Sequence, residues 1–169
     1  DVYKRQVAGN TVGHNGGYIP WFDEYDPATG EWTVLENAPR SRDHFHATVA
    51  NNKLYVLGGR LTGGEGGTFA PVISEVDVYD FTSSSWSTLP SSANLPTPRA
   101  ASATVNFNGK IVVIGGEGNG QAYVNTDELD ISTNTWSSLS DLNHPRHGTQ
   151  GIVSGNGIWI TSGSPNQGG

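Results

Sequence analysis

Histidines in two short patterns are the first candidates for chemistry in this sequence. His44 and His46 are two residues apart, which places both rings on one face if the segment is a strand. His144 and His147 are three residues apart in a segment that reads as a loop. Imidazole ligates zinc and other transition metals, but such sites need three or four ligands, and neither pair has a third at a fixed spacing. We therefore expect no metal ion and no other cofactor in this chain.

Three other patterns resemble binding or catalytic motifs, and each has a simpler interpretation. The glycine-rich run from Gly116 to Gly120 is followed by no helix that could carry a dinucleotide phosphate. Asp23, Glu24 and Asp26 cluster as calcium ligands do, but they fit a tight turn better. No serine lies in the Gly-x-Ser-x-Gly pattern of a hydrolase nucleophile. The sequence thus contains no catalytic set that its spacing alone identifies.

The composition excludes several classes of protein. With 9 Lys and Arg against 16 Asp and Glu, the net charge is −7, which argues against a nucleic-acid-binding surface. The absence of Cys excludes disulfides, Cys-ligated zinc and iron–sulfur clusters from this chain. No stretch approaches the roughly 20 apolar residues of a membrane-spanning helix. Few Lys and many Ser, Thr, Asn and Gly residues favour an exported protein, extracellular or periplasmic.

The elements that must position any site are set by a repeat. Three tryptophans, Trp32, Trp86 and Trp136, are separated by 54 and 50 residues, and an aspartate precedes each by six positions. A Pro-Arg segment and two short apolar stretches follow each tryptophan. The second stretch ends in small residues: Gly58-Gly59, Gly115-Gly116 and Ser162-Gly163. A period near 50 residues indicates a repeat architecture.

Each repeat reads as four short strands, which we letter a to d in chain order. In the second repeat we expect strands at residues 45–50, 54–57 and 75–79, and a fourth around Trp86. The first alternates apolar and polar residues, whereas the second is continuously apolar and suits a strand covered on both faces. Turns rich in Asn, Gly and Ser join a to b and c to d. No segment has a helical period, so the fold class is all-β and antiparallel.

These units resemble the Kelch repeat. The Gly-Gly pair after strand b, the Tyr-Asp pair before the c–d turn and the tryptophan on strand d match its pattern, over about residues 7–163. The resemblance implies four-stranded antiparallel blades of a β-propeller, with the tryptophan packed on a neighbouring blade. Leu129 replaces the Tyr and Ser162 replaces the first Gly in the third unit.

Counting the units divides the chain into two whole blades and two halves. Residues 7–41 form the C-terminal half of a blade, 42–98 and 99–145 form whole blades, and 146–169 form an N-terminal half. Residues 1–6 look foreign to the repeat and resemble the translation of a sequencing adapter, so we interpret them as a scar. A Kelch propeller closes with roughly five to seven blades, so we expect the remaining blades elsewhere in the parent chain.

Long, uneven loops mark one end of the expected propeller as its binding face. In an antiparallel blade the b–c loops and the d–a connections emerge together, opposite the short a–b and c–d turns, and loops longer than their structural task requires are functional candidates. The candidate ligand-binding residues there are Arg42, Arg60, Arg99, Arg146, His14, His147, Glu65 and Glu117. In the structural alternative, the arginines that follow proline join neighbouring blades, and Glu65 is a solvated loop charge.

Two classes of function fit these observations. The first is a noncatalytic binding module that holds a protein or carbohydrate partner on the loop face, where the aromatic residues Tyr18, Trp21, Phe69 and Tyr123 could stack on sugar rings. The second is part of a sugar-acting enzyme, since galactose-oxidase-like oxidases and Kelch-type sialic-acid epimerases share such propellers. The oxidase cofactor needs a Cys cross-linked to a Tyr, so the catalytic residues would lie mostly outside this chain. We expect the binding module; an intracellular adaptor is a third alternative.

Overall fold

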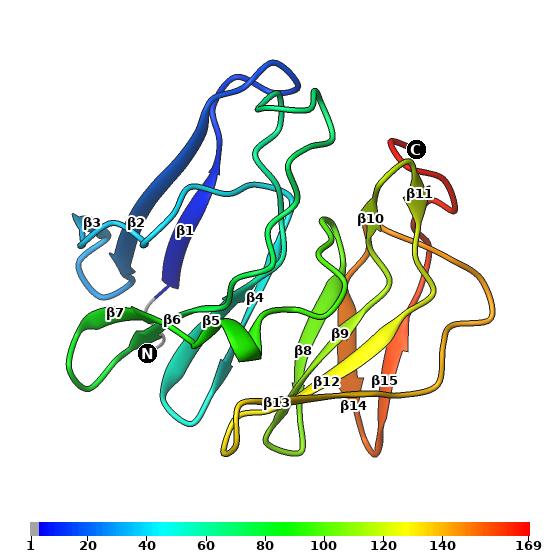
Figure 1. Ribbon diagram of the computed structural model, residues 1–169. Coiled ribbons are helices and arrows are strands. Elements are labelled where there is room, and N and C mark those ends of the chain that lie inside the picture. The colour runs from blue at the N-terminus through cyan, green and yellow to red at the C-terminus, as the bar shows by residue number, and fades with distance from the viewer. Residues whose placement is uncertain (1–3) are drawn as a thin grey trace.

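Short antiparallel strands form a row of four sheets in the computed structural model, which describes residues 4–169 (Figure 1). Each sheet is a blade, numbered here in chain order. Blade 1 contains β1 (Lys4–Asn10), β2 (Tyr18–Asp26) and β3 (Glu31–Val34). Blade 2 contains β4 (His46–Ala50), β5 (Lys53–Leu57), β6 (Asp77–Asp80) and β7 (Ser85–Thr88).

The remaining strands complete a second whole blade and begin another. Blade 3 contains β8 (Ala103–Phe107), β9 (Lys110–Ile114), β12 (Thr126–Asp130) and β13 (Thr135–Ser138). Blade 4 contains β14 (Gly151–Ser154) and β15 (Gly157–Ile160). A short hairpin of β10 (Glu117–Gly118) and β11 (Gln121–Ala122) lies in the b–c loop of blade 3, and one turn of 3-10 helix, η1 (Ser91–Ala93), lies between blades 2 and 3.

The all-β class and the four-stranded antiparallel blades predicted from the sequence are confirmed. Strand bounds differ from expectation by one or two residues, as for β4, which begins at His46, and β6, which begins at Asp77. Lys4–Gln6 belong to β1 and pair with residues 23–25 of β2, so the sheet continues through part of the expected scar. Residues 1–3 of that segment lie outside the described residues, and its origin stays a prediction.

Apolar residues fill the space between successive blades. Strand β5 shows the principle: Leu54 and Val56 face Phe22 of blade 1, while Tyr55 and Leu57 face Ile111 and its neighbours in blade 3. Because alternate side chains of a strand point to opposite faces, a strand sandwiched between two blades must be apolar throughout. This explains the continuous apolar run in the second strand of each repeat.

The Gly-Gly pairs lie where the backbones of neighbouring blades approach most closely. Gly59 and Gly116 have φ of 93° and 110°, in the region that favours glycine. Their amides donate to the carbonyls of Arg99 and Arg146, each in the following blade, at 3.0 and 2.8 Å. The glycines thus fix the spacing of the blades at the start of each b–c loop.

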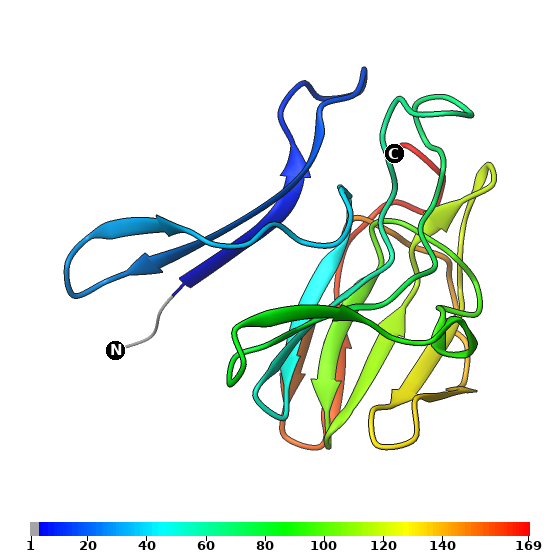
Figure 2. The same ribbon diagram turned by 60° about the vertical axis from the view of Figure 1, so that its left-hand side comes forward.

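The long loops of all four blades gather at one end of the molecule. Figure 1 shows the β1–β2 and β5–β6 loops, the β10–β11 hairpin and the C-terminal segment at the top, with the a–b hairpin turns at the bottom. The turned view keeps the C-terminal segment among these loops (Figure 2). We call this the loop end and the opposite side the turn end. Among residues 4–169, no helix is long and apolar enough to span a membrane.

Candidate functional site

Equivalent residues of successive blades are brought together at the loop end by short backbone bridges. The residue after each Gly-Gly or Ser-Gly pair bridges the residue after the repeat arginine of the same blade. These bridges are Asp43–Arg60 in blade 2, Ala100–Glu117 in blade 3 and His147–Ser164 in blade 4. The backbone bonds are the same in each blade, but the side chains differ. The fold therefore fixes where these side chains lie without fixing which residues they are.

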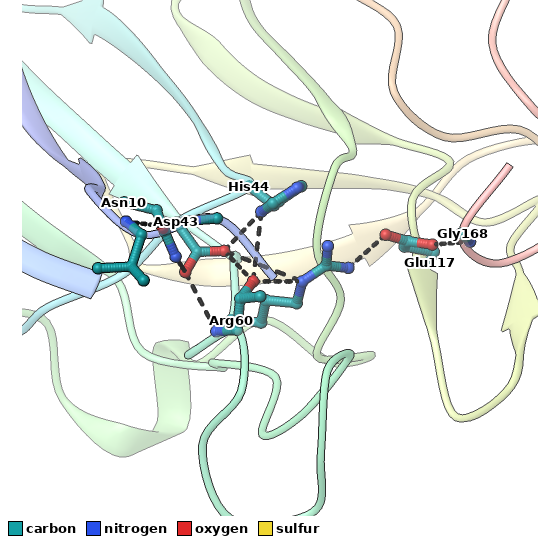
Figure 3. A network of polar contacts seen from close by, with 9 residues as sticks. Asn10, Asp43, His44, Arg60, Glu117 and Gly168 are labelled. Atoms are coloured by element: carbon teal, nitrogen blue, oxygen red, sulfur yellow. Dashed lines mark hydrogen bonds and ion pairs between the residues drawn. The ribbon is translucent and has the colours of Figure 1, made fainter. Parts of the chain in front are cut away.

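The side chains at these positions form a polar network that crosses three blade boundaries (Figure 3). Between blades 1 and 2, the Asn10 amide donates to Asp43 Oδ2 at 3.2 Å. Between blades 2 and 3, Arg60 Nη1 pairs with Glu117 Oε1. The other Glu117 oxygen accepts a 2.8 Å hydrogen bond from the Gly168 amide, in the segment that follows blade 4. We call this set, with Thr62, His44 and His147, the central network.

The charged members of the central network are almost fully buried. Arg60 is 1% exposed, and Asp43 and Glu117 are each 2% exposed. Arg60 Nε donates to Thr62 Oγ1 at 2.9 Å, and that hydroxyl donates to Asp43 Oδ1 at 2.5 Å. The Phe69 ring covers the guanidinium, with 4.9 Å from Cζ to the ring centroid. Buried charges need partners of this kind, because an unpaired charge is strongly destabilising away from water.

Hydrogen bonds keep Asp43 ionised in spite of its surroundings. Burial by itself raises the pKa of this carboxyl group, but hydrogen bonds from Thr62, His44 and Asn10 outweigh burial and hold the pKa below its usual value. A carboxylate only accepts hydrogen bonds, so His44 Nδ1, 2.5 Å from Asp43 Oδ1, carries the shared hydrogen. The Nε2 atom of a neutral His44 is then an acceptor.

His147 occupies the matching place beside the other carboxylate. Its Nε2 atom lies 2.7 Å from the Asn166 carbonyl oxygen and 3.5 Å from Glu117 Oε2. Each of the two buried carboxylates therefore has one histidine within reach. His44 comes from the connection between blades 1 and 2, and His147 comes from the connection between blades 3 and 4.

A cavity of about 170 Å³ opens beside the central network. It brings together four of the candidate residues from the sequence, His14, Arg60, Glu117 and His147. The remaining lining residues are His44, Phe69, Ala101, Gly148 and Gly168. A second cavity of about 570 Å³ shares Phe69 with the first and is otherwise lined by Gly66, Thr68, Ala70, Pro71, Val72, Asn119, Gly120 and Gln167.

The other candidate arginines lie away from this cavity, inside their own blades. Arg42, 1% exposed, donates to the Gly58 carbonyl at 2.7 Å and to Asp77 Oδ2 at 2.5 Å. Burial is the main cause that lowers the pKa of Arg42 to about 10, against the opposing effect of Asp77, so it stays charged at neutral pH. These side-chain contacts lie within blade 2, and so differ from the structural alternative in which Arg42 joins neighbouring blades.

Arg99 and Arg146 occupy the same repeat position as Arg42. Arg99 Nη2 lies 2.9 Å from Asp127 Oδ2 and donates to the Val113 carbonyl at 3.1 Å. Arg146 donates to the Ser162 carbonyl at 2.9 Å. Glu65 is exposed in the b–c loop of blade 2 and forms no ion pair among the described residues. Ligand contacts by these residues stay a prediction.

Sequence reasoning missed Asp43 and Thr62 as partners of Arg60, and His44 as a partner of Asp43. One signal was available: Asp43, Ala100 and His147 share a repeat position but differ in type, which a purely structural position would not need. The acidic partners of the arginines also had a signal. An aspartate recurs three residues before the turn aspartate, at Asp77 and Asp127. Within residues 4–169 no three His, Asp or Glu side chains are grouped so as to hold a metal ion.

Known proteins share this arrangement of repeats. A family model described as the KLHDC2/KLHL20/DRC7 Kelch-repeats domain matches residues 11–165. Kelch-like protein terF of Aspergillus terreus is 31% identical over 141 residues, which cover 81% of this chain and 29% of terF. Alpha-scruin of Limulus polyphemus is 29% identical over 145 residues, covering 80% of this chain and 15% of alpha-scruin.

A solved structure supports the same fold. The structure of YjhT matches with a TM-score of 0.73 at 18% sequence identity, over 90% of this chain and 47% of YjhT. The chain therefore spans about half of YjhT and less than a third of terF and alpha-scruin.

Proposed function

This chain belongs to the Kelch-repeat family, and from that membership we propose that it is part of a β-propeller that binds a protein or carbohydrate partner at its loop end. Kelch repeats commonly serve as protein-interaction modules. At the bridges of the loop end, the side chains differ between blades while the backbone hydrogen bonds repeat. That contrast is the observation that carries the proposal.

The turn end supports the proposal as an internal comparison. In three blades the aspartate before the c–d turn, Asp26, Asp80 or Asp130, accepts a hydrogen bond from the backbone amide two residues later. The three distances are 2.8, 2.8 and 2.9 Å. One structural task, closing a turn, explains these residues fully. No such shared task explains Asn10, Arg60 and Glu117 at the loop end.

Both kinds of partner find suitable groups there. The larger cavity places the Phe69 ring beside the neutral polar side chains of Thr68, Asn119 and Gln167. An aromatic ring with amide side chains around it suits a sugar ring, and the same groups suit an uncharged peptide segment. Of the other aromatic candidates, Tyr123 is buried, while Tyr18 and Trp21 are partly exposed on β2.

Two asparagines provide a matched test of the loop end. Asn119 lines the larger cavity, whereas Asn108 lies in the a–b turn of blade 3, and both are exposed with φ near 50°. The Asn119→Lys and Asn108→Lys variants add the same side chain in the same backbone conformation at opposite ends. The measurement is binding of the 169-residue chain and the two variants to a glycan array and to a peptide array.

We expect Asn119→Lys to remove the array signals that the unaltered chain gives, and Asn108→Lys to keep them. Equal losses in the two variants would remove the assignment to the loop end. Turnover of an arrayed sugar, instead of binding, would favour the alternative in which the propeller belongs to a sugar-acting enzyme.

A further inference from the structure

We propose that the 170 Å³ cavity beside the central network receives a neutral carboxamide, the side chain of an Asn or Gln residue of a partner protein. The inference rests on the proposed function and names the chemistry that the loop end recognises. It depends on one unused donor, one unused acceptor and the charge already buried around them.

The unused donor belongs to Arg60. Its Nε and Nη1 atoms are engaged by Thr62 and Glu117, while Nη2 has no hydrogen bond within the described part of the chain. The residue is 1% exposed, and it lines the cavity. Because Arg60 lines the cavity, this N–H group can donate to an acceptor that a ligand delivers there.

The unused acceptor belongs to His44. In the neutral form of the ring, with the Nδ1 hydrogen donated to Asp43, Nε2 carries a lone pair, and the ring lines the same cavity. Thr62 Oγ1 lies 2.9 Å from Arg60 Nε and 3.5 Å from His44 Nδ1, so the guanidinium and the imidazole are neighbours. One ligand group with an acceptor and a donor on adjacent atoms can therefore meet both. A carboxamide has its C=O and NH₂ groups on one carbon.

The buried charges favour a neutral group over an ionised one. Asp43 and Glu117 contribute two negative charges, and Arg60 contributes one positive charge. A carboxylate ligand would place a third negative charge beside two that are already paired, whereas an ammonium group would meet Arg60. A carboxamide satisfies both hydrogen-bonding atoms without adding charge. Phe69 and Ala101 supply apolar walls for the methylene groups of an Asn or Gln side chain.

The fold itself does not need an imidazole at this position. His44 has φ of 49°, and the equivalent residues of the next two blades are Ala101 and Gly148, with φ of 51° and 67°. All three continue the same backbone pattern, since Ala101 N donates to His44 O and Gly148 N donates to Ala101 O. A bulky residue in left-handed backbone costs stability and persists where it has a use.

Propanamide and propanoate test the inference, because they have nearly the same shape and differ in charge. Each is titrated into the 169-residue chain labelled at histidine, and the His44 Cε1–H signal is followed by NMR. The variants are His44→Ala, which installs the residue found at the equivalent Ala101, and His46→Ala. His46 lies two residues further along and does not line the cavity, so the second variant is a matched control.

We expect propanamide to shift the His44 signal and to bind more tightly than propanoate. His44→Ala should weaken propanamide binding by about fivefold, the effect of one neutral hydrogen bond, and His46→Ala should leave it unchanged. Tighter binding of propanoate would overturn the inference and identify an anion site. No shift with either probe would overturn it outright. If array binding is lost in Asn119→Lys but kept in His44→Ala, the proposed function stands and this inference fails.

Discussion

The indole nitrogen of Trp86 donates a 3.0 Å hydrogen bond to the carbonyl of Glu36, in the segment that leaves blade 1. Its ring also meets Phe22 of β2 edge to face, with 5.1 Å between centroids. Trp136 repeats the contact one blade later, donating to the Ala93 carbonyl at 2.8 Å. Trp86 and Trp136 thus join their blades to the preceding ones, as the resemblance to the Kelch repeat implied.

Truncation of Trp86 should therefore lower the stability of the whole row of blades. We expect Trp86→Ala to lower the free energy of unfolding by about 3 kcal/mol, since it removes packing against Phe22 and Tyr79 and the indole hydrogen bond. Trp32→Ala is the matched control, because Trp32 holds the same repeat position in blade 1 but is 54% exposed. It should cost less than about 1 kcal/mol. Urea unfolding followed by circular dichroism measures both, and equal losses would contradict the role in joining blades.

Removal of a buried carboxylate should lower the stability of the fold, because it leaves the partner arginine without a counter-charge. Asp77 pairs with Arg42 inside blade 2 and also with Arg40, so Asp77→Asn leaves a guanidinium buried without its counter-charge. We expect a loss of about 3 kcal/mol in unfolding free energy. Asp23 has the equivalent place in blade 1 and no ion-pair partner in residues 4–169. Asp23→Asn should change stability by no more than about 0.5 kcal/mol. Similar losses in the two variants would show that the ion pair is not what stabilises blade 2.

Two glycines separate the effect of backbone conformation from the effect of close packing at the Ala100–Glu117 bridge of blade 3. A Cβ atom on Gly116, at φ of 110°, would lie 2.9 Å from the Ala100 carbonyl oxygen and 3.1 Å from the Arg99 side chain. Gly109 also has positive φ, 78°, but a Cβ atom there meets nothing within 4 Å. Gly109→Ala should cost about 1 kcal/mol, from backbone strain alone. Gly116→Ala should cost about 3 kcal/mol, and thermal unfolding of the two variants measures the difference. A difference near zero would show that the packing around Gly116 in blade 3 tolerates the added methyl group.

Acid should release the stability that Asp43 contributes. Its pKa in the folded state lies below its usual value, so the ionised form is favoured by folding. The contribution is complete above the unfolded-state pKa, about 3.9, and is lost as the pH falls through the lower folded-state value. The Asp43→Asn variant lacks this pH-dependent contribution to stability. The difference in melting temperature between the unaltered chain and Asp43→Asn should be largest near neutral pH and should shrink below about pH 4. A difference that grows on acidification would contradict the direction of the shift.

Most of the fold follows from local patterns that the repeat presents more than once. The apolar run in β5, the Gly-Gly pair after it and the turn aspartate each have one physical cause, and each recurs in other blades. Recurrence separates these signals from chance, which is why the all-β class and the four-stranded blades could be predicted from the sequence. Lys4–Gln6 were set aside because their segment looks foreign to the repeat and resembles a translated adapter, yet these residues pair with β2 as part of β1.

The site was only partly predictable, because its contacts cross between blades. Loop length drew attention to Arg60, Glu117 and His147, but their distances depend on how neighbouring sheets are rotated and staggered. Arg60 and Glu117 are 57 residues apart in the chain, and no local pattern reports that they meet. The same limitation hid the buried state of Arg42, whose aspartate partner lies 35 residues further on.

The backbone bridges at the loop end allow the side chains that each blade places there to be replaced by others. Since the same backbone hydrogen bonds join Asp43 to Arg60, Ala100 to Glu117 and His147 to Ser164, a substitution at any of these sites changes the side chains of the loop end while the backbone bridge remains. The side chains of such a surface can therefore be changed one blade at a time, by evolution or by design. Such changes are limited by the neighbouring blade, because a charge introduced in one blade needs an opposite charge in the next.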